Sequence, residues 1–106
     1  MPFTTIKRKS DFNRIYHQGQ RTDGRYLKVY IAENDLDMLR AGISTGKYIG
    51  NSVVRNRIRR IIKEVLRKTG QKQKGLDLLI IAKKESAFAT YEQLKQFLNQ
   101  VLSAYK

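Results

Sequence analysis

The chain has 106 residues, of which 22 are lysine or arginine and 9 are aspartate or glutamate, so its formal charge at pH 7 is +13. It has no cysteine and one histidine, His17, which excludes disulfides, thiol catalysis and any site that needs two histidines. Its length indicates one domain over residues 1–106, and a hydrophobic fraction of 41% suffices for a packed core. The charge favours a polyanionic partner, with nucleic acid ahead of an anionic membrane surface.

The longest apolar run, Leu78 to Ala82, is too short to cross a bilayer. The first ten residues, "MPFTTIKRKS", lack the apolar segment of a secretory signal. The sequence therefore predicts a soluble cytoplasmic protein.

The first predicted element is a short helix. Ser10 is the expected N-cap, Asp11 lies in the first turn where the helix dipole favours an acid, and Gly19 is the expected terminator. An additional short strand is expected before Gly24.

The next segment, "RYLKVYIAE", alternates as a strand does. One face is aliphatic; the other is aromatic and basic and comprises Tyr26, Lys28 and Tyr30. The polar "ENDLD" after it favours a hairpin turn, with "MLRAGIST" as the returning strand.

The second half of the chain predicts a helix, a strand and a helix. Gly46 to Ser52 is a loop that ends in a cap for the first of these helices, and Thr69 to Gly75 is a mobile, positively charged connection. "LDLLIIA" is too continuously apolar for an edge, so it is expected to be a central strand. Thr90 and Gln93 form a capping-box pattern at the start of the last helix. The fold class is α+β, a single two-layer sandwich of α-β-β-β-α-β-α order.

The segment "GNSVVRNRIRRIIKEVLRK", from Gly50 to Lys68, carries seven basic residues and one acid, Glu64. At helical spacing its aliphatic residues share a core-facing stripe. This stripe comprises Val54, Ile58, Ile61, Ile62 and Val65. The opposite face comprises Asn56, Arg60, Lys63 and Arg67.

A solvated charged face would normally mix signs to form i,i+4 pairs, whereas this one is almost entirely positive. Arginine outnumbers lysine, and its planar fork suits bidentate phosphate contacts. A membrane-surface helix would need a free apolar face, which the core requires here. No helix-turn-helix precedes Gly50, so RNA is favoured over DNA. Tyr26, Lys28 and Tyr30 are equally compatible with stacking of unpaired bases and with ordinary packing under a helix.

Two other patterns fail as functional motifs. "GISTGK" has three residues between its glycines, and Tyr48 follows Lys47, so it does not match a phosphate-binding P-loop. The acidic residues Glu33, Asp35 and Asp37 fit a polar turn better than a metal site. No catalytic residue, bound metal or cofactor of the protein alone is expected.

Four stretches together are similar to one known family. "GNSVVRNRIRR", its lead-in "GISTGKYIGN", the earlier "SDFNRIYHQG" and the later "DLLIIAKKESAFATYEQL" closely resemble the protein subunit of bacterial ribonuclease P. Gly46 and Tyr48 depart from the Ser and Lys of many relatives. The resemblance implies a ribosomal-protein-like fold with a left-handed βαβ crossover, against the usual right-handed rule.

The resemblance also implies a function. In this family a large RNA removes the 5′ leader of precursor tRNA with magnesium ions, and the small basic protein binds that RNA and the leader without supplying catalytic residues. Magnesium is therefore expected in the holoenzyme through the RNA, and neither DNA nor membrane is an expected partner. The alternative is a general ribosomal-type RNA-binding module with no role in tRNA processing.

The family's roles carry over to two sets of residues. Those implied to contact the RNA subunit are Arg55, Asn56, Arg57 and Arg60, with Arg67 and Lys68 as extensions. Those implied to bind the leader are the aromatic Phe12, Tyr16 and Tyr30 and the basic Arg59 and Lys63.

Overall fold

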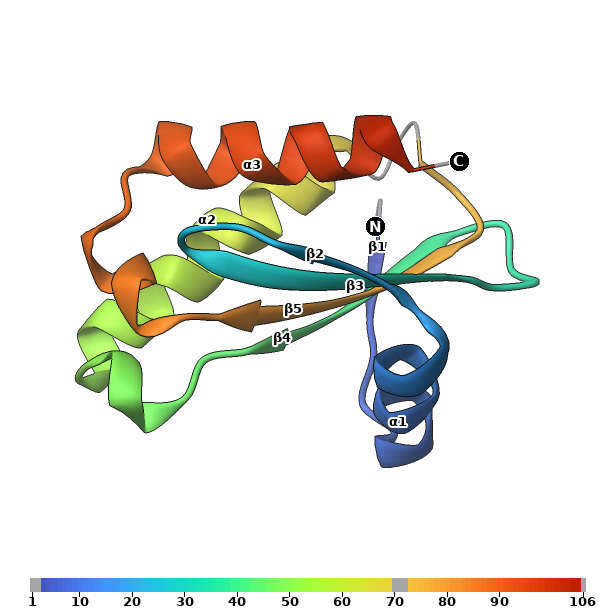
Figure 1. The fold of residues 1–106 in the computed structure, drawn as a ribbon, viewed down its shortest axis with the longest axis horizontal. Helices are drawn as coiled ribbons and strands as arrows, with labels where there is room; N and C mark the ends of the chain where they lie inside the picture. Colours follow the sequence, from blue (N-terminus) through green and yellow to red (C-terminus); the bar gives the residue numbers. More distant parts are fainter. Residues whose placement is uncertain (1–2, 70–72, 106) are drawn as a thin grey trace.

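A mixed sheet of five strands, in the order β1-β4-β5-β3-β2, organises the chain (Figure 1). The structure is a computed structural model that describes residues 3–69 and 73–105. Its strands are β1 (Phe3–Thr5), β2 (Gln20–Asp23), β3 (Leu27–Glu33), β4 (Leu39–Ser44) and β5 (Leu76–Ala82). Its helices are α1 (Lys9–Gln18), α2 (Ser52–Thr69) and α3 (Tyr91–Ala104), with short 3-10 helices η1 (Lys47–Ile49) and η2 (Lys84–Phe88). The predicted α+β sandwich is confirmed.

Strand β5 lies at the centre of the sheet, as its apolar sequence predicts. It pairs in parallel with β4 and antiparallel with β3. The predicted hairpin between β3 and β4 is therefore wrong, because β5 is inserted between them. The reason is that β5 is apolar on both faces and gains most from two paired neighbours and two covered faces.

The two faces of the sheet carry separate apolar clusters. Helices α2 and α3 cover the larger one, where Leu27, Leu78 and Ile80 meet Ile58 and Leu98. Helix α1 packs on the opposite face, at one end of the sheet, over a small cluster. This small cluster comprises Ile6, Ile15, Tyr30, Ala32 and Leu79. Most of this second face is left without a covering helix (Figure 1).

Three of the four predicted helix ends agree with the structure. Thr90 and Gln93 form both hydrogen bonds of a capping box at α3, and Asn51 Oδ1 accepts a hydrogen bond from the Val54 amide at the start of α2. Gly19 follows the end of α1 as its C-cap, and a side chain there would collide with the Ile15 carbonyl. The Ser10 cap is wrong: α1 begins at Lys9, so Ser10 lies within its first turn.

The N-terminal strand β1 was missed, whereas β2 is the short strand expected before Gly24. Three residues are too few to show alternation, and β1 is identified only by its parallel pairing with β4. The predicted mobile connection from Thr69 to Gly75 includes residues 70–72, which lie outside the described residues.

Candidate nucleic-acid interface

Helix α2 presents its basic side chains on the side away from the sheet, as its spacing predicts. Ile58, Ile62 and Val65 are buried against the core together with Leu66. Because that apolar stripe fixes the rotation of the helix, the charged residues must point outward. The exposed members of the predicted RNA-subunit set are Asn56, Arg57, Arg60, Arg67 and Lys68.

Asn56, Arg59, Arg60 and Lys63 line one shallow surface depression. Two of them were assigned to the RNA subunit and two to the leader, so the structure brings the two predicted sets together on one stretch of α2. The guanidinium groups of Arg59 and Arg60 and the ammonium group of Lys63, from two successive turns, can reach a phosphate backbone lying in this depression.

Several basic residues of α2 already have partners. Arg57 donates a hydrogen bond to the Ala89 carbonyl at 2.7 Å, and Arg59 donates one to Thr45 Oγ1. Lys68 is 3.8 Å from Glu64, one turn earlier. Arg55 is half-buried, and within the described part of the chain its Nε has no hydrogen-bond partner. Arg55 is thus less exposed to solvent than Arg57 and Arg60.

The open face of the sheet is the one opposite α2, and its side chains are ordered in rows by strand pairing. One row joins Tyr30 on β3, Leu79 on β5 and Gly42 on β4. The next joins Lys28, Ile81 and Ser44, one pleat closer to Thr45 and hence to Arg59. Arg59 thereby links the basic depression of α2 to the end of β4, next to the second of these rows.

Of the predicted aromatic residues, only Tyr16 presents an exposed ring. Its side chain is 51% exposed, whereas Tyr30 beneath it is 4% exposed, with 5.0 Å between the ring centroids. Burial raises the pKa of the Tyr30 phenol. Phe12 is half-buried, and its ring occupies the space that a side chain at Gly42 would need. Together they form a layered aromatic surface on which a base can stack.

Tyr26 does not lie on this face, which corrects the predicted strand face. It precedes β3 and packs against the core cluster under α2 and α3. Of the two interpretations left open for the tyrosines, ordinary packing is therefore correct for Tyr26.

The sequence did not single out Arg21. On the edge strand β2 it pairs with Tyr30, and its guanidinium donates to Asp23 Oδ2 at 2.7 Å. That hydrogen bond holds the pKa of Asp23 below its usual value. With Lys28 on β3, Arg21 gives the open face a second basic border, opposite Arg59. Only the register of β2 reveals this position.

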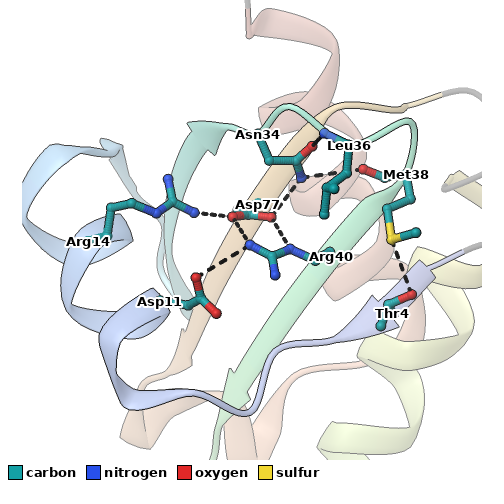
Figure 2. A network of polar contacts seen from close by, with 8 residues as sticks. All are labelled: Thr4, Asp11, Arg14, Asn34, Leu36, Met38, Arg40 and Asp77. Atoms are coloured by element: carbon teal, nitrogen blue, oxygen red, sulfur yellow. Dashed lines mark hydrogen bonds and ion pairs between the residues drawn. The ribbon is translucent and has the colours of Figure 1, made fainter.

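Helix α1 is held on the sheet by the carboxylate of Asp77, which is fully buried within β5 (Figure 2). Arg40 donates two hydrogen bonds to it, at 2.8 and 2.6 Å, and Asn34 donates a third at 2.7 Å. Arg14 reaches the same carboxylate from α1, and Asp11 of α1 lies 3.5 Å from Arg40. In the sequence, Asp77 lies within the apolar run LDLLIIA, so no local pattern marked it as the centre of an ion-pair network.

The ionisation of Asp77 is set by opposing effects. Burial alone would raise its pKa, but hydrogen bonds from Arg40 and Asn34 and the charge of Arg40 outweigh burial and hold the pKa below its usual value. The carboxylate is therefore charged at neutral pH and paired on every side.

Two general properties bear on what the surface can bind. Among the described residues, no three histidine, aspartate or glutamate side chains gather as a metal site would require. Within residues 3–69 and 73–105, no helix combines the length and apolar composition needed to span a membrane.

Residues 2–106 match the family model described as Ribonuclease P. The chain belongs to the ribonuclease P protein family. It is 38% identical, over 97 residues, to the ribonuclease P protein component of Streptococcus pyogenes serotype M5, covering 92% of this chain and 82% of the relative. The RNase P protein of Staphylococcus aureus has a similar structure, with a TM-score of 0.85, 35% identity and coverage of 93% and 92% of the two chains.

The ribonuclease P protein of Thermotoga maritima shares the fold, with a TM-score of 0.84 at 23% identity over 96% of this chain and 97% of that one. In this fold β4, α2 and β5 form a crossover between neighbouring parallel strands. A connection of the opposite hand would not superpose, so the crossover has the hand found in these structures. Its left-handedness stays a prediction.

Replacing the buried carboxylate should destabilise this ribonuclease P protein strongly. We expect Asp77→Asn to lower the free energy of unfolding at pH 7 by about 3 kcal/mol, because Arg14 and Arg40 lose their shared counter-charge. The measurement is urea unfolding followed by circular dichroism. Since the pKa of Asp77 is lowered by folding, its contribution is present above the unfolded pKa of about 4 and is lost as pH falls through the folded value. The variant should therefore lose less stability than the wild type on acidification.

Asp35→Asn is the matched control, since Asp35 is exposed in the turn between β3 and β4. Its free energy of unfolding should stay within about 0.5 kcal/mol of the wild type. Equal losses in the two variants would show that the Asp77 network does not stabilise the fold.

Proposed function

We propose that this chain is the RNA-binding subunit of ribonuclease P, which binds the catalytic RNA through α2 and the 5′ leader of precursor tRNA through the open sheet face. The observation that carries the proposal is the presence, on one small domain, of a basic depression along α2 and an exposed, layered Tyr16–Tyr30 pair on the open sheet face. Family membership supports the ribonuclease P part of the proposal.

The RNA subunit is the proposed partner of the N-terminal half of α2. Arg55, Asn56, Arg57 and Arg60 follow the family motif, and Arg67 and Lys68 extend the basic surface toward the end of the helix. Phosphates of a folded RNA would neutralise charges that otherwise repel one another on a single helix. This explains why the segment from Gly50 to Lys68 has seven basic residues and one acid.

The leader is the proposed occupant of the open sheet face. Tyr16 offers a stacking surface supported from below by Tyr30 and beside it by Phe12. Arg59 and Lys63 border it on the α2 side, and Arg21 and Lys28 border it on the other. From β2 to β4 the sheet spans three strand spacings, or about 14 Å, which suits one nucleotide strand between two basic borders.

Catalysis is assigned to the RNA, with magnesium ions held in the holoenzyme through the RNA. The protein's contribution is to hold the leader and the RNA subunit near each other. In this account no protein side chain transfers a proton or attacks phosphorus.

The direct test is reconstitution. The purified chain, a bacterial ribonuclease P RNA and 5′-labelled precursor tRNA are mixed at low magnesium concentration, and cleavage is followed with each component omitted in turn. We expect correctly placed 5′ cleavage that needs the RNA and is stimulated by the protein. Tight RNA binding without stimulation would instead support a ribosomal-type binding module.

Tyr16→Ala should weaken the holoenzyme's binding of precursor tRNA about tenfold, since it removes one stacking surface. Binding of mature tRNA, which lacks the leader, should change less than about twofold. The measurement is the Kd of each tRNA for the reconstituted holoenzyme. Tyr16 is preferred to Tyr30 because its ring is exposed and its truncation spares the core.

The matched control is Tyr91→Ala, which removes a tyrosine at the start of α3, on the other side of the sheet. It should leave both Kd values unchanged. If Tyr16→Ala weakened precursor and mature tRNA equally, the leader would have no place on this face.

Arg60→Ala should weaken assembly of the protein with the RNA subunit. The plot of log affinity against log salt concentration should become less steep by about 0.7 to 0.9, because one phosphate contact is lost. Lys95→Ala, a charge removed from α3, serves as the control and should leave the slope unchanged. An unaltered slope for Arg60→Ala would remove Arg60 from the RNA interface.

A further inference from the structure

Three large apolar side chains lie exposed at the end of the molecule where β4 and β5 terminate. Tyr48, Val53 and Phe88 are 56%, 75% and 85% exposed, and we call them the Phe88 patch. They come from η1, the first turn of α2 and the end of η2, three elements that contact one another. In Figure 1 these elements gather at one end of the sheet, away from α1 and from the turn between β3 and β4.

Two hydrogen bonds hold the elements of the patch in place. Tyr48 donates its hydroxyl to the Ala82 carbonyl at 2.7 Å, which fixes η1 to the end of β5. Arg57 donates to the Ala89 carbonyl at 2.7 Å, which fixes the segment after η2 to α2. Val53 is one helical turn before Arg57 and shares its side of α2. The exposed position of Phe88 is thus set by ordered neighbours.

The exposure of Phe88 brings no benefit to folding. Burying a phenylalanine side chain is worth about 1.5–3 kcal/mol, and this one contributes almost none of it in the free protein. Clustered exposed apolar side chains mark interaction surfaces. The Phe88 patch therefore needs a partner that covers it.

The charges around the patch indicate which kind of partner. Lys47, Arg57 and Lys84 are exposed around it, against one exposed acid, Glu85. The patch is also continuous with the basic face of α2 through Arg57. A surface that combines an aromatic ring with guanidinium and ammonium groups suits RNA, whose bases stack and whose phosphates pair with the cations. A second copy of this strongly positive chain would be repelled.

We propose that Phe88 stacks on an unpaired base or an exposed terminal base pair of the ribonuclease P RNA. Arg57 then has two roles: one N–H holds the Phe88 segment through Ala89, and the rest of its guanidinium contacts the adjacent phosphate. This surface lies outside both the depression on α2 and the open sheet face. It goes beyond the proposed function by adding a base contact at the start of α2.

The chain has no tryptophan, so Phe88→Trp introduces a single fluorescent reporter. We expect its emission to be quenched when the ribonuclease P RNA is added, because a stacked base quenches indole. Leu36→Trp is the matched control: Leu36 is 43% exposed in the turn between β3 and β4, among acidic residues and at the opposite end of the sheet. Its emission should change little. Equal quenching at both positions, or none at Phe88→Trp, would overturn the proposal.

Affinity for the RNA subunit gives a second measurement. Phe88→Ala should weaken binding about tenfold, the value expected for one stacked base, whereas Phe88→Tyr should stay within about twofold of the wild type. Phe88→Leu keeps an apolar side chain without a π face, and it should behave like Phe88→Ala. Equal affinity of the leucine and wild-type proteins would overturn the stacking contact.

Two further outcomes separate this proposal from its alternatives. If Phe88→Ala left RNA affinity unchanged and reduced self-association of the free protein in light scattering, the patch would be a contact between copies and the proposal would be wrong. Fluorescence and affinity need no cleavage, so quenching at Phe88→Trp would support the base contact even if reconstituted cleavage failed. Normal cleavage without quenching would reject the base contact alone.

Discussion

The structure depends on a negative charge buried in a strongly positive protein. Asp77 sits inside the most apolar strand, where an unpaired carboxylate would be costly, and it is stable there because Arg14, Arg40 and Asn34 donate to it together. These donors come from α1, β4 and the segment after β3. One carboxylate thereby fixes α1 on the second face of the sheet and sets where Tyr16 lies. The charges of these two arginines are compensated within the fold.

The basic residues of α2 differ from Arg14 and Arg40 in how far their charge is compensated. Within residues 3–69 and 73–105, no comparable network of acids compensates the basic residues of α2, and Lys68 alone among them has an ion pair, with Glu64. The apolar contacts of Ile58 and Ile62 hold the helix against the sheet despite the repulsion on its outer side. The free protein therefore displays unneutralised charge, which phosphate groups can neutralise at low conformational cost. Paired cations organise the fold, and the unpaired cations of α2 form the surface that we propose binds RNA.

The sequence predicted the elements whose signal is local and missed those that depend on pairing. Periodicity identified the core side of α2, and short-range side-chain chemistry identified the capping box of α3. Strand order is a long-range property, so the apparent hairpin concealed the insertion of β5. The role of Asp77 could not be predicted from local patterns, because Arg40 and Arg14 lie 37 and 63 residues away from it in the sequence. No local sequence pattern singled out Arg21 or Phe88. The register of β2 places Arg21 opposite Tyr30, and the exposure of the ring at the end of η2 identifies Phe88. Of the residues assigned by resemblance, four line one depression on α2, namely Asn56, Arg59, Arg60 and Lys63. Tyr30 is buried and supports Tyr16 from below.

We expect the Asp77 network to hold α1, and with it the aromatic surface of Tyr16, in place without affecting the basic face of α2. The most direct measurement is the ratio of precursor to mature tRNA affinity for a holoenzyme that carries Asp77→Asn, at a temperature where circular dichroism shows the variant to be folded. The account predicts that the preference for precursor tRNA falls several-fold while affinity for the RNA subunit stays within about twofold. An undiminished preference in the folded variant, or an equal loss of RNA-subunit binding, would contradict it.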